Sequence, residues 1–399
     1  MSQNCAQRHS AGDTPEEQQR AAADAETPSK PAEDERIVVL GLRGFPNVQG
    51  GVESHCNQIY PRLSRLRRRE ITVLARKSYM PASADLGDGL KVKPIWSVRN
   101  KHLEALLHTF LGILVAVLGE NPELIHLHAI GPGLFTPLAK LFGKRVVVTH
   151  HGKDYDRPKW NRFAKVVLRL GEALAVRFAD RVIVVSRSAA ADLKQRFPRR
   201  ADRIVFIPNG ATQLPLDPNP QATLARFGLR RGDFVLSVGR LEPSKGFHDL
   251  IAAHRKAATG RKLVIAGGAD HADAYSRTLQ AEAGDDVVFT GMLAPAELRT
   301  LYSNAALFVL ASSHEGLPIA ALEAVACGAP VVLSDIQPNL DVDLPGLHYF
   351  PVGNIEALAA KLTAPAEAFR APQSMLARYD WDRVAEETDA IYCKAMARP

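Results

Sequence analysis

The sequence predicts an α/β protein with two doubly wound parallel sheets, each of Rossmann-like topology, facing a cleft. Short apolar runs alternate with helical patterns along most of the chain, which is typical of parallel strands joined by crossover helices. The chain has 399 residues, enough for two domains of ordinary size. A proline-rich segment, QLPLDPNP, separates two such series of runs and is typical of a linker.

Eleven apolar runs are the expected strands. In the first half they are Ile37–Leu40, Ile71–Ala75, Leu124–Leu127, Val146–Thr149 and Val182–Val185, with Ile204–Ile207 before the linker. In the second half they are Phe234–Val238, Lys262–Ala266, Val287–Phe289, Leu307–Leu310 and Val331–Leu333. Ligands of such sheets bind outside the carboxyl ends of the strands, so the loops that follow these runs are the places to search for a site.

The domain organisation follows from these runs and from composition. Residues 1–35 are rich in Ala, Gln, Glu, Asp and Pro and almost lack large apolar side chains, so we expect a disordered acidic tail. We expect an N-terminal domain over residues 36–208 and a C-terminal domain over residues 209–380. The helical pattern in residues 381–399 follows the last strand and predicts a helix that can pack on either domain.

Charge is distributed unevenly along the chain. Residues 36–200 contain 29 basic and 12 acidic side chains, a net charge of +17, whereas residues 1–35 and 201–399 each carry −5. Two basic clusters stand out: Arg62, Arg65, Arg67, Arg68 and Arg69, and Arg157, Lys159, Arg162, Lys165 and Arg169. A basic face attracts anionic lipid or nucleic acid. Because the sequence shows no nucleic-acid-binding motif, we favour an anionic membrane surface and expect no nucleic-acid partner.

The expected location is cytoplasmic, with peripheral attachment to the inner face of the cytoplasmic membrane. The most apolar stretch, Leu103–Leu118, is too short to span a bilayer and predicts a buried or interfacial helix. The start of the chain lacks the features of a signal peptide. The four cysteines are far apart, which is typical of free thiols in a reducing compartment and makes a zinc site improbable: Cys5, Cys56, Cys327 and Cys393.

Two glutamates eight positions apart, Glu315 and Glu323, are the most informative feature. They lie in SHEGLPIAALEAVACGAPVV, where a short loop precedes an Ala-rich helix. Eight helical residues rise about 12 Å, roughly the separation of sugar and ribose in a nucleotide-sugar. The helix N-terminus favours a diphosphate between the two carboxylates. A capped surface helix with two solvated acids is the alternative.

Other loops after predicted strands add groups suited to an anionic ligand. Gly50–Gly51 precede an amphipathic helix and allow close approach of backbone N–H groups to a phosphate. Arg240 and Lys245 flank a tight turn and can neutralise a diphosphate leaving group without a metal. Backbone near Gly268, and near Met292 in the loop after the next run, is a weaker candidate for donor contacts.

Histidines follow the fourth predicted strand in the motif THHGKDYD. His150 and His151 come directly after the strand, so one imidazole can project into the cleft and hydrogen-bond a substrate hydroxyl. His126 lies in the strand before and His128 directly follows it; both are further candidate metal ligands, and His126 is also a candidate core histidine. No spacing among these residues completes a standard metal site, so we expect no metal.

These motifs, in this order, resemble those of the retaining family 4 glycosyltransferases of the GT-B fold. The resemblance covers most of residues 36–395 and is closest to the bacterial branch that builds exopolysaccharide and O-antigen chains. It rests on GGVE at Gly50–Glu53, HHG at His150–Gly152, SVGRLEPSKG at Ser237–Gly246 and EGLPIAALE at Glu315–Glu323. The sequence departs from the family after HHG, where KDYD replaces an LDW-like turn.

The resemblance implies the role of each matched residue in the second half. Arg240 and Lys245 would bind the donor diphosphate, Glu315 the transferred sugar and Glu323 the ribose. The terminal helix would cross back onto the first domain.

The remaining matched residues would surround the donor sugar and its phosphates. Backbone at Gly316 and Leu317 would face them, Gly51 would approach the phosphates across the cleft, and His151 would contact the sugar. The candidate catalytic residues are therefore His151, Arg240, Lys245 and Glu315. The candidate donor-binding residues are Gly50, Gly51, Gly268, Met292, Gly316, Leu317 and Glu323.

The implied reaction moves a sugar from a nucleotide-diphosphate sugar to a hydroxyl of a saccharide or lipid-linked acceptor, with retention and without a metal or other cofactor. Bacterial surface polysaccharide synthesis is the implied setting. Two alternatives remain from the sequence: a nucleotide-sugar epimerase of the same fold, and a non-catalytic membrane-associated assembly protein.

Overall fold

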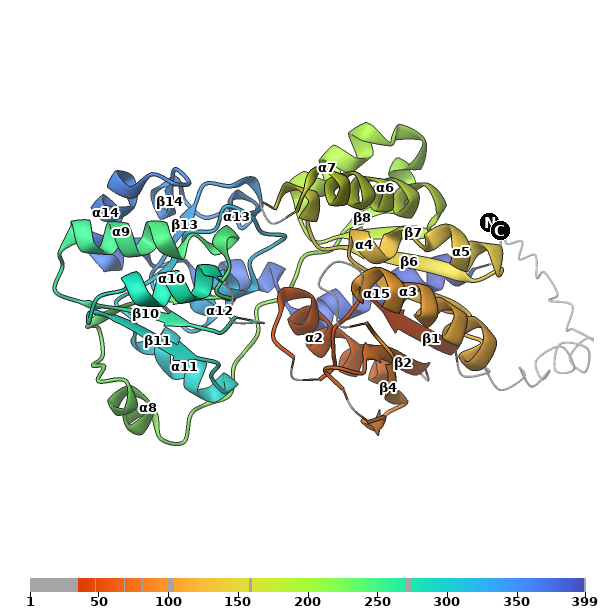
Figure 1. Cartoon of the computed structure of the whole chain (residues 1–399), viewed down its shortest axis with the longest axis horizontal. Coiled ribbons are helices and arrows are strands. Elements are labelled where there is room, and N and C mark those ends of the chain that lie inside the picture. Colours follow the sequence, from red (N-terminus) through yellow and green to blue (C-terminus); the bar gives the residue numbers. More distant parts are fainter. Residues whose placement is uncertain are drawn as a thin grey trace, which may run out of the picture. The chain divides into compact units, whose positions relative to one another are not determined.

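The computed structural model describes residues 35–46, 48–67, 69–80, 82–98, 104–157, 160–269 and 274–397. The tail expected over residues 1–35 lies outside this part except for its last residue. From Arg36 onward the chain forms one compact unit with two sheets (Figure 1). Among the described residues, no helix combines the length and the apolar character needed to cross a membrane.

The first sheet has eight strands in the order β3-β4-β2-β1-β5-β6-β7-β8. Their bounds are β1 Glu35–Leu40, β2 Arg69–Arg76, β3 Ala84–Asp85, β4 Leu90–Ile95, β5 Leu124–His128, β6 Arg145–His150, β7 Arg181–Val184 and β8 Ile204–Phe206. The short strand β3 runs antiparallel to β4, whereas β4, β5, β6, β7 and β8 pair in parallel with their inner neighbours.

The second sheet is parallel, in the order β11-β10-β9-β12-β13-β14. Its strands are β9 Phe234–Val238, β10 Lys262–Ala266, β11 Val287–Gly291, β12 Leu307–Leu310, β13 Val331–Ser334 and β14 Tyr349–Phe350. In both sheets the first strand lies in the middle and the order reverses beside it, as in doubly wound folds. The reversal falls between β1 and β5 in the first sheet and between β9 and β12 in the second, which marks the loops after these strands as ligand positions.

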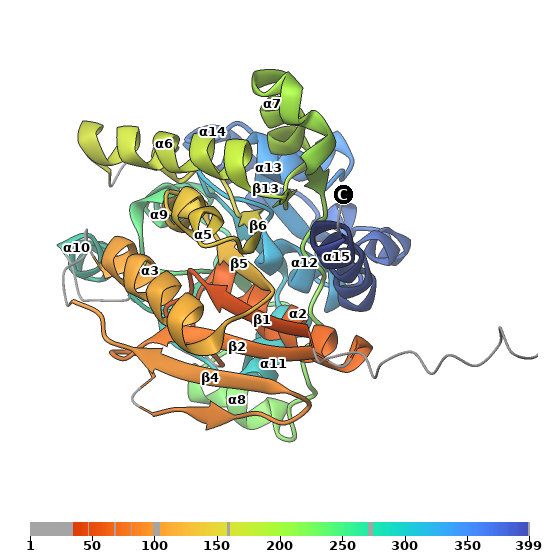
Figure 2. The ribbon, with the colours of Figure 1, turned by 90° about the vertical axis from the view of Figure 1, so that its right-hand side faces the viewer.

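Helices cover both faces of each sheet, as Figure 2 shows for the first sheet. In the first half they are α2 Gly51–Leu66, α3 Glu104–Val115, the π-helical turn η1 Ala116–Glu120, α4 Ile130–Gly133, α5 Thr136–Leu141, η2 Asp154–Asp156, α6 Arg162–Phe178, α7 Arg187–Arg196 and η3 Pro198–Arg203. In the second half they are α8 Pro220–Arg226, η4 Pro243–Lys245, α9 Phe247–Ala257, α10 Ala274–Glu282, α11 Pro295–Asn304, α12 Ile319–Ala326, α13 Gln337–Leu340, η5 Gly346–His348, α14 Ile355–Thr363, η6 Ala366–Phe369, η7 Gln373–Arg378 and α15 Trp381–Met396.

Alternate residues of each central strand point to opposite faces and belong to separate cores. In β1, Ile37 and Val39 pack with α2 and α15, whereas Val38 and Leu40 pack with α3 and α7 on the other face. Both faces of a central parallel strand are therefore buried, which explains why these strands read as continuous apolar runs.

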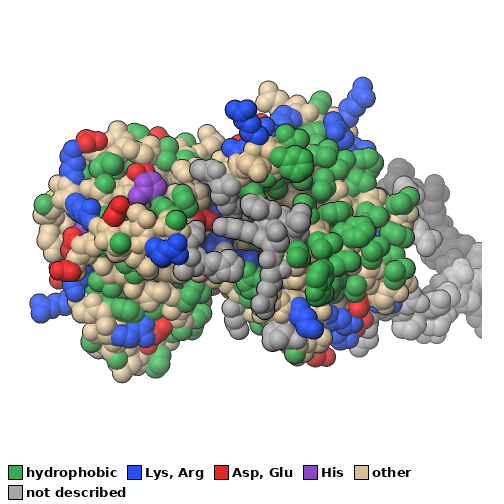
Figure 3. Space-filling model, in the orientation of Figure 1, with side chains coloured by type: hydrophobic (Ala, Val, Ile, Leu, Met, Phe, Trp, Pro, Cys, Tyr) green, Lys and Arg blue, Asp and Glu red, His purple; other side chains and the backbone are tan. Residues whose placement is uncertain are grey.

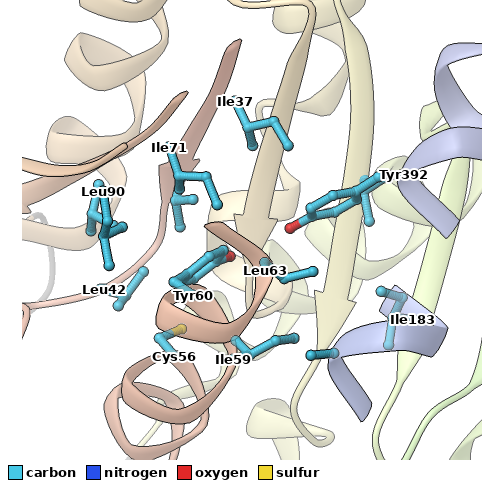
Figure 4. Close-up of a cluster of buried hydrophobic side chains, with 14 of the residues drawn as sticks. Ile37, Leu42, Cys56, Ile59, Tyr60, Leu63, Ile71, Leu90, Ile183 and Tyr392 are labelled. Carbon is cyan, nitrogen blue, oxygen red and sulfur yellow. The ribbon is translucent and has the colours of Figure 1, made fainter. Parts of the chain in front are cut away.

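The last helix, α15, packs against the first sheet. It contacts α2 and β6, and its buried side chains join the core that includes β1. Figure 4 shows Tyr392 of α15 and Tyr60 of α2 with their hydroxyl groups directed toward one another. The chain passes between the sheets twice, after β8 and before α15, and the two passages touch. Ala211 N donates to Tyr379 O at 2.6 Å, and a Cβ at Gly210 would lie 2.5 Å from ring carbons of Trp381.

The predicted fold class is confirmed, and each of the eleven predicted strands is present. Three strands were not predicted: β3, β4 and β14. β4 reads LKVKPI, whose two lysines and proline interrupt the apolar run, and the other two have only two residues each. The predicted helix at Leu103–Leu118 is α3 followed by η1, although Leu103 itself lies outside the described residues. One side of this helix buries His108 and Ile113, while Phe110, Val115 and Leu118 are exposed.

Candidate functional site

Loops from both halves of the chain line one cleft of about 900 Å³. This volume is within the usual range for small-molecule sites. The lining comes mainly from the loops after β1, β6, β9 and β12, and three of these loops, after β1, β9 and β12, follow strands at which the strand order reverses. The topology therefore gathers at one place the segments that the sequence analysis selected.

All but two of the predicted site residues line this cleft. Those present are Gly50, Gly51, His151, Arg240, Lys245, Glu315, Gly316, Leu317 and Glu323. Gly268 and Met292 are not among the lining residues. They lie next to each other instead, since a Cβ at Gly268 would be 3.5 Å from Met292 Cγ, and the Met292 side chain is exposed.

The glycine pair leaves the N-terminus of α2 without covering side chains where it lines the cleft. Gly50 is the N-cap of α2 and has a φ of 154°, a conformation that favours glycine. A Cβ at Gly50 would lie 2.1 Å from Glu53 Oε2, while one at Gly51 would meet no described atom within 4 Å. The space over Gly51 is therefore open to a ligand, and the positive end of the helix dipole favours an anion there.

Lys245 and Glu315 form an ion pair within the cleft. Lys245 Nζ donates to Glu315 Oε1 at 2.7 Å, and their side chains are only 17% and 11% exposed. The pair joins the loop after β9 to the loop after β12. Gly246 fixes the same junction: its φ is 66°, and a Cβ there would lie 2.1 Å from Ala311 O. An ammonium group and a carboxylate are thus held side by side on a compact backbone support.

A third cation, which the sequence analysis placed only in a basic surface cluster, comes from the first half. Arg157 donates from Nη2 to Glu242 Oε1 and from Nη1 to Asp154 Oδ1 at 3.4 Å. Arg240 Nη2 donates to the same Glu242 oxygen at 3.4 Å. Glu242 thus holds one guanidinium from each half of the chain beside the cleft. The sequence feature that indicates a place for Arg157 in the cleft is its position in the loop after a predicted strand.

The HHG and EGLP loops touch through their backbones. A Cβ at Gly316 would lie 1.9 Å from His151 O, and one at Gly152 would lie 3.3 Å from Glu315 O. Asn209 adds a polar link, because its Nδ2 donates to Leu317 O at 3.0 Å. Asn209 lies between the predicted strand Ile204–Ile207 and the proline-rich linker, and the local sequence gives no sign of this contact. Glycine at 152 and 316 is therefore needed for close approach of the two halves.

Glu323 is in the second turn of α12, but Glu315 precedes the helix, which begins at Ile319. The estimate of an eight-residue helical rise therefore does not apply to their separation. Tyr302 OH donates to Glu323 Oε2 at 3.3 Å. Burial raises the pKa of Glu323 to about 7, although hydrogen bonds from Tyr302 and Thr212 oppose this shift. Glu323 is half-buried in the cleft wall, where its carboxyl group can accept hydrogen bonds from hydroxyl groups of a ligand.

The two histidines after β6 have different environments. His150 is buried, with its Nε2 3.0 Å from Glu172 Oε1, and only His151 lines the cleft. Burial, together with His55 and His126, lowers the pKa of His151 well below its usual value, so its ring is neutral. His126 is a core histidine: its Nε2 lies 2.8 Å from Thr149 Oγ1 and burial lowers its pKa to about 3.

Comparison with protein families matches both halves of the chain. The family described as Glycosyltransferase Family 4 matches residues 49–212, and the family described as Glycosyl transferases group 1 matches residues 227–366. The chain is 30% identical over 312 residues to alpha-maltose-1-phosphate synthase of Mycolicibacterium smegmatis, covering 70% of this chain and 80% of the relative. It is 31% identical over 393 residues to a glycosyltransferase of Methanocaldococcus jannaschii, covering 90% and 98%.

A third relative is the GDP-mannose:cellobiosyl-diphosphopolyprenol alpha-mannosyltransferase of Komagataeibacter xylinus, 28% identical over 405 residues, covering 93% of this chain and 96% of the relative. Among solved structures, sucrose-phosphate synthase from Thermosynechococcus elongatus aligns with a TM-score of 0.74 at 22% identity, covering 90% of this chain and 98% of that one. Anabaena HepE in complex with UDP and glucose aligns with a TM-score of 0.71 at 20% identity, covering 90% and 99%. The chain therefore belongs to the glycosyltransferases and has the GT-B fold, with a family 4 domain in its first half and a group 1 domain in its second.

Proposed function

We propose that this glycosyltransferase moves a sugar from a nucleotide-diphosphate sugar to a hydroxyl of a saccharide or lipid-linked saccharide, with retention at the anomeric carbon, in bacterial surface polysaccharide synthesis. The observation that carries the proposal is the convergence of cations, a bare helix N-terminus and two carboxylates on one cleft. The name of the Komagataeibacter xylinus relative, which includes a GDP-sugar and a diphosphopolyprenol acceptor, supports both substrate classes.

In the proposed complex the donor diphosphate contacts Arg240 and Lys245 and faces the N-terminus of α2 across the cleft. Glu323 accepts hydrogen bonds from the ribose hydroxyl groups, and Glu315 accepts hydrogen bonds from hydroxyl groups of the transferred sugar. The neutral ring of His151 hydrogen-bonds the same sugar. The Lys245–Glu315 pair supports this division, because one partner suits an anion and the other suits hydroxyl groups.

The proposed chemistry exchanges one C–O bond for another at the anomeric carbon. The bond to the diphosphate oxygen breaks while the acceptor oxygen bonds on the same face, and the departing diphosphate takes the acceptor proton. Negative charge grows on the leaving oxygen, so Arg240, Lys245 and the helix dipole stabilise the transition state more than the ground state. These fixed cations supply the charge that a divalent ion provides elsewhere, so we propose that transfer needs no metal.

We further propose that the first half docks on an anionic membrane where a lipid-linked acceptor resides. On α6, Phe163, Val166 and Leu170 are spaced by three and four residues and are 77%, 60% and 47% exposed. Three basic residues follow the same spacing on the adjoining stripe: Arg162, Lys165 and Arg169. Apolar and basic stripes side by side are typical of helices that lie in a membrane interface.

Other helices extend this apolar surface. Figure 3 shows hydrophobic side chains gathered over the right-hand part of the molecule, where Figure 1 places α3, α5 and α6. Large exposed side chains on or next to these helices include Phe110, Val115, Leu118, Leu141, Phe142 and Phe178. A soluble monomer rarely exposes so many large apolar groups on neighbouring helices without a partner surface.

A donor panel tests the transferase proposal. Thermal unfolding is measured with UDP, GDP, ADP and dTDP and their sugars, since a ligand at 100 times its Kd adds about 2.7 kcal/mol. We expect one nucleotide to shift Tm, the shift to be lost in Glu323→Ala, and the shift to be kept in the control Glu386→Ala, whose side chain is exposed on α15.

With that donor and an acceptor, the anomeric signal of the product by NMR reports retention, and added EDTA should leave turnover unchanged. Sugar interconversion without acceptor would instead indicate an epimerase.

Vesicle sedimentation tests membrane docking. The wild-type chain should bind vesicles containing phosphatidylglycerol at low salt and dissociate as salt rises. Phe163→Asp should weaken binding at least about tenfold, because it places a charge on the apolar stripe. Leu216→Asp, at a leucine that is also 77% exposed but lies before α8, is the matched control and should bind normally. Equal binding by both variants would rule out α6 as the docking helix.

A further inference from the structure

We propose that His55, His128 and His151 bind a single transition-metal ion, and that the bound ion inhibits transfer by withdrawing His151 from the donor. Each histidine offers one ring nitrogen, and the three nitrogens lie within 4.8 Å of one another. They come from three separate segments: α2, the end of β5, and the loop after β6. The metal site itself does not depend on the proposed function, whereas the inhibition does.

The spacing is close to that of a three-histidine site. Zinc–nitrogen bonds of about 2.05 Å at tetrahedral angles place ligand nitrogens about 3.3 Å apart. His128 Nδ1 and His151 Nε2 are 2.9 Å apart, and no pair in the cluster exceeds 4.8 Å. Coordination would therefore require movements of roughly 1.5 Å or less, and His151 lies in the cleft wall, where its side chain is not fully enclosed.

His55 carries the most specific sign of a ligand. Its Nδ1 lies 2.9 Å from Asn209 Oδ1, and Asn209 Nδ2 donates to Leu317 O, which fixes the amide orientation. The proton of His55 is therefore on Nδ1, and a lone pair remains on Nε2. That Nε2 is buried and has no hydrogen-bond partner among the described residues, in a side chain that is 98% buried. A ring whose other nitrogen donates to an oxygen is the usual arrangement of a metal-bound histidine.

His128 and His151 face each other through two ring nitrogens that share one proton. His128 Nε2 contacts Tyr60 OH, whose oxygen can accept a hydrogen bond from an Nε2–H group. If the shared proton moves to the far nitrogen of the ring that carries it, which is Nε2 of His128 or Nδ1 of His151, both facing nitrogens present lone pairs. Two facing lone pairs repel unless a cation lies between them. A metal ion can thus replace the shared proton through a tautomer change, without net proton release.

The chemistry of these ligands selects the kind of metal. A metal ion binds the neutral imidazole form of histidine. Three nitrogen ligands suit Zn²⁺, Co²⁺, Ni²⁺ or Cu²⁺, whereas Mg²⁺ and Ca²⁺ prefer oxygen. The cluster is therefore distinct from a magnesium site for the donor diphosphate.

Metal binding would disable the proposed donor contact. His151 is the member of the group that lines the cleft, and it directly precedes the Gly152–Gly316 backbone contact. A ring nitrogen that coordinates an ion cannot also hydrogen-bond the donor sugar, and the ring would be held toward His128. We therefore expect micromolar zinc to act as an inhibitor of an enzyme that needs no metal.

Cobalt titration tests the site directly. The full chain, prepared without a histidine tag and freed of metal by a chelator, is titrated with Co²⁺ and followed by visible absorbance. We expect one equivalent to bind, with affinity at least about 100-fold lower in His55→Ala, beyond the 10- to 100-fold typical of losing a partner outside the ligand set. His248→Ala is the control, because His248 is an exposed histidine on α9. Equal affinity of wild type and His55→Ala, or no binding up to about 100 µM, would overturn the site.

A second variant separates ligation from folding. His55→Cys should bind Co²⁺ with a new thiolate-to-cobalt charge-transfer band in the near ultraviolet, which a merely structural role of His55 would not produce. Absence of this band in a folded, cobalt-bound His55→Cys protein would show that residue 55 is not a ligand.

Turnover with and without Zn²⁺ then tests inhibition. Wild type and His248→Ala should lose most activity at one bound equivalent and regain it with chelator, whereas the ratio for His55→Ala should stay near one. Stoichiometric binding with unchanged turnover would disprove the inhibition and leave the site intact. Activity that appears only with metal would contradict the metal-free transfer proposed above, whatever the titration shows.

Discussion

At the scale of single residues, the charges of the cleft are paired with one another. Lys245 is paired with Glu315, and Arg240 and Arg157 share Glu242. These pairs hold the cations in place before a donor binds, which lowers the cost of ordering them in the complex. A donor diphosphate must compete with carboxylates for the same cations. Each of these residues therefore has both a catalytic and a structural role. The effect of substituting one of them on turnover must be compared with that of a matched control substitution.

Lys245→Ala should lower kcat/KM by about 10²- to 10³-fold, since it removes a cation from the leaving group. It also leaves the mostly buried Glu315 carboxylate without its ammonium partner, at a cost of about 1–3 kcal/mol in unfolding free energy. Steady-state kinetics and urea unfolding measure the two effects. Lys256→Ala is the control, because the Lys256–Glu356 pair is exposed and its loss should change neither kcat/KM nor the free energy of unfolding. Near-normal turnover in Lys245→Ala would contradict the proposed role.

Glu323→Gln should change how stability depends on pH. The pKa of Glu323 is about 7 in the folded chain, against an ordinary 4.5. Between these values the folded state binds a proton that the unfolded state does not, so this group makes stability fall as pH rises from about 4.5 to 7, then level off. The variant lacks this loss and should gain about 2–3 kcal/mol over wild type between pH 4.5 and 8. Unfolding in urea across that range measures the difference, and parallel curves would contradict the raised pKa.

At the scale of elements, short loops with glycine set the spacing of the site. The EGLP loop before α12 and the HHG loop after β6 approach through Gly316 and His151, where no side chain fits between them. Strands end and helices begin on either side of these loops, so the secondary structure sets where the functional groups lie. An added methyl group at the contact between Gly316 and His151 should therefore disturb the site more than it disturbs the hydrophobic cores.

Gly316→Ala should lower turnover at least tenfold, because its Cβ would lie 1.9 Å from His151 O and the two loops must separate. Gly346→Ala is the matched control: it lies at the start of η5, and a Cβ there would meet no described atom within 4 Å. Donor KM and kcat of both variants should be measured beside their Tm. If Gly316→Ala matches Gly346→Ala, the loop contact is unimportant for catalysis.

At the scale of the whole molecule, the last helix belongs to the first core. Removal of residues 381–399 should prevent cooperative unfolding, because α15 supplies Trp381, Val384 and Tyr392 to the core around β1. Loss of several buried side chains of this size costs more than the usual stability of a domain. Thermal unfolding by circular dichroism is the measurement. A chain ending at Met396 is the control, and a cooperative transition in the shorter chain would show that α15 is dispensable.

The sequence predicted the parallel strands and the loops that line the cleft, because buried strands are continuous apolar runs and sites follow strand ends. It did not predict β4, whose lysines break the run, or the pairing of Arg157 with Glu242, which lie 85 positions apart. His55 was missed for the same reason: a histidine in an amphipathic helix gives no sign of two others that folding places beside it. Contacts between distant segments are the part that local patterns do not contain.

The position of α15 has a consequence for how the protein is made. A ribosome releases the strands of the first sheet early, but the part of one face that α15 covers stays exposed until that helix has been synthesised. The second sheet lies entirely within the intervening segment and can form first. Part of the first core is thus completed after the second sheet, although its strands come earlier in the sequence. Apolar side chains of these strands remain exposed while hundreds of further residues are synthesised. Chaperone dependence of the nascent chain should accordingly be greatest for its first half.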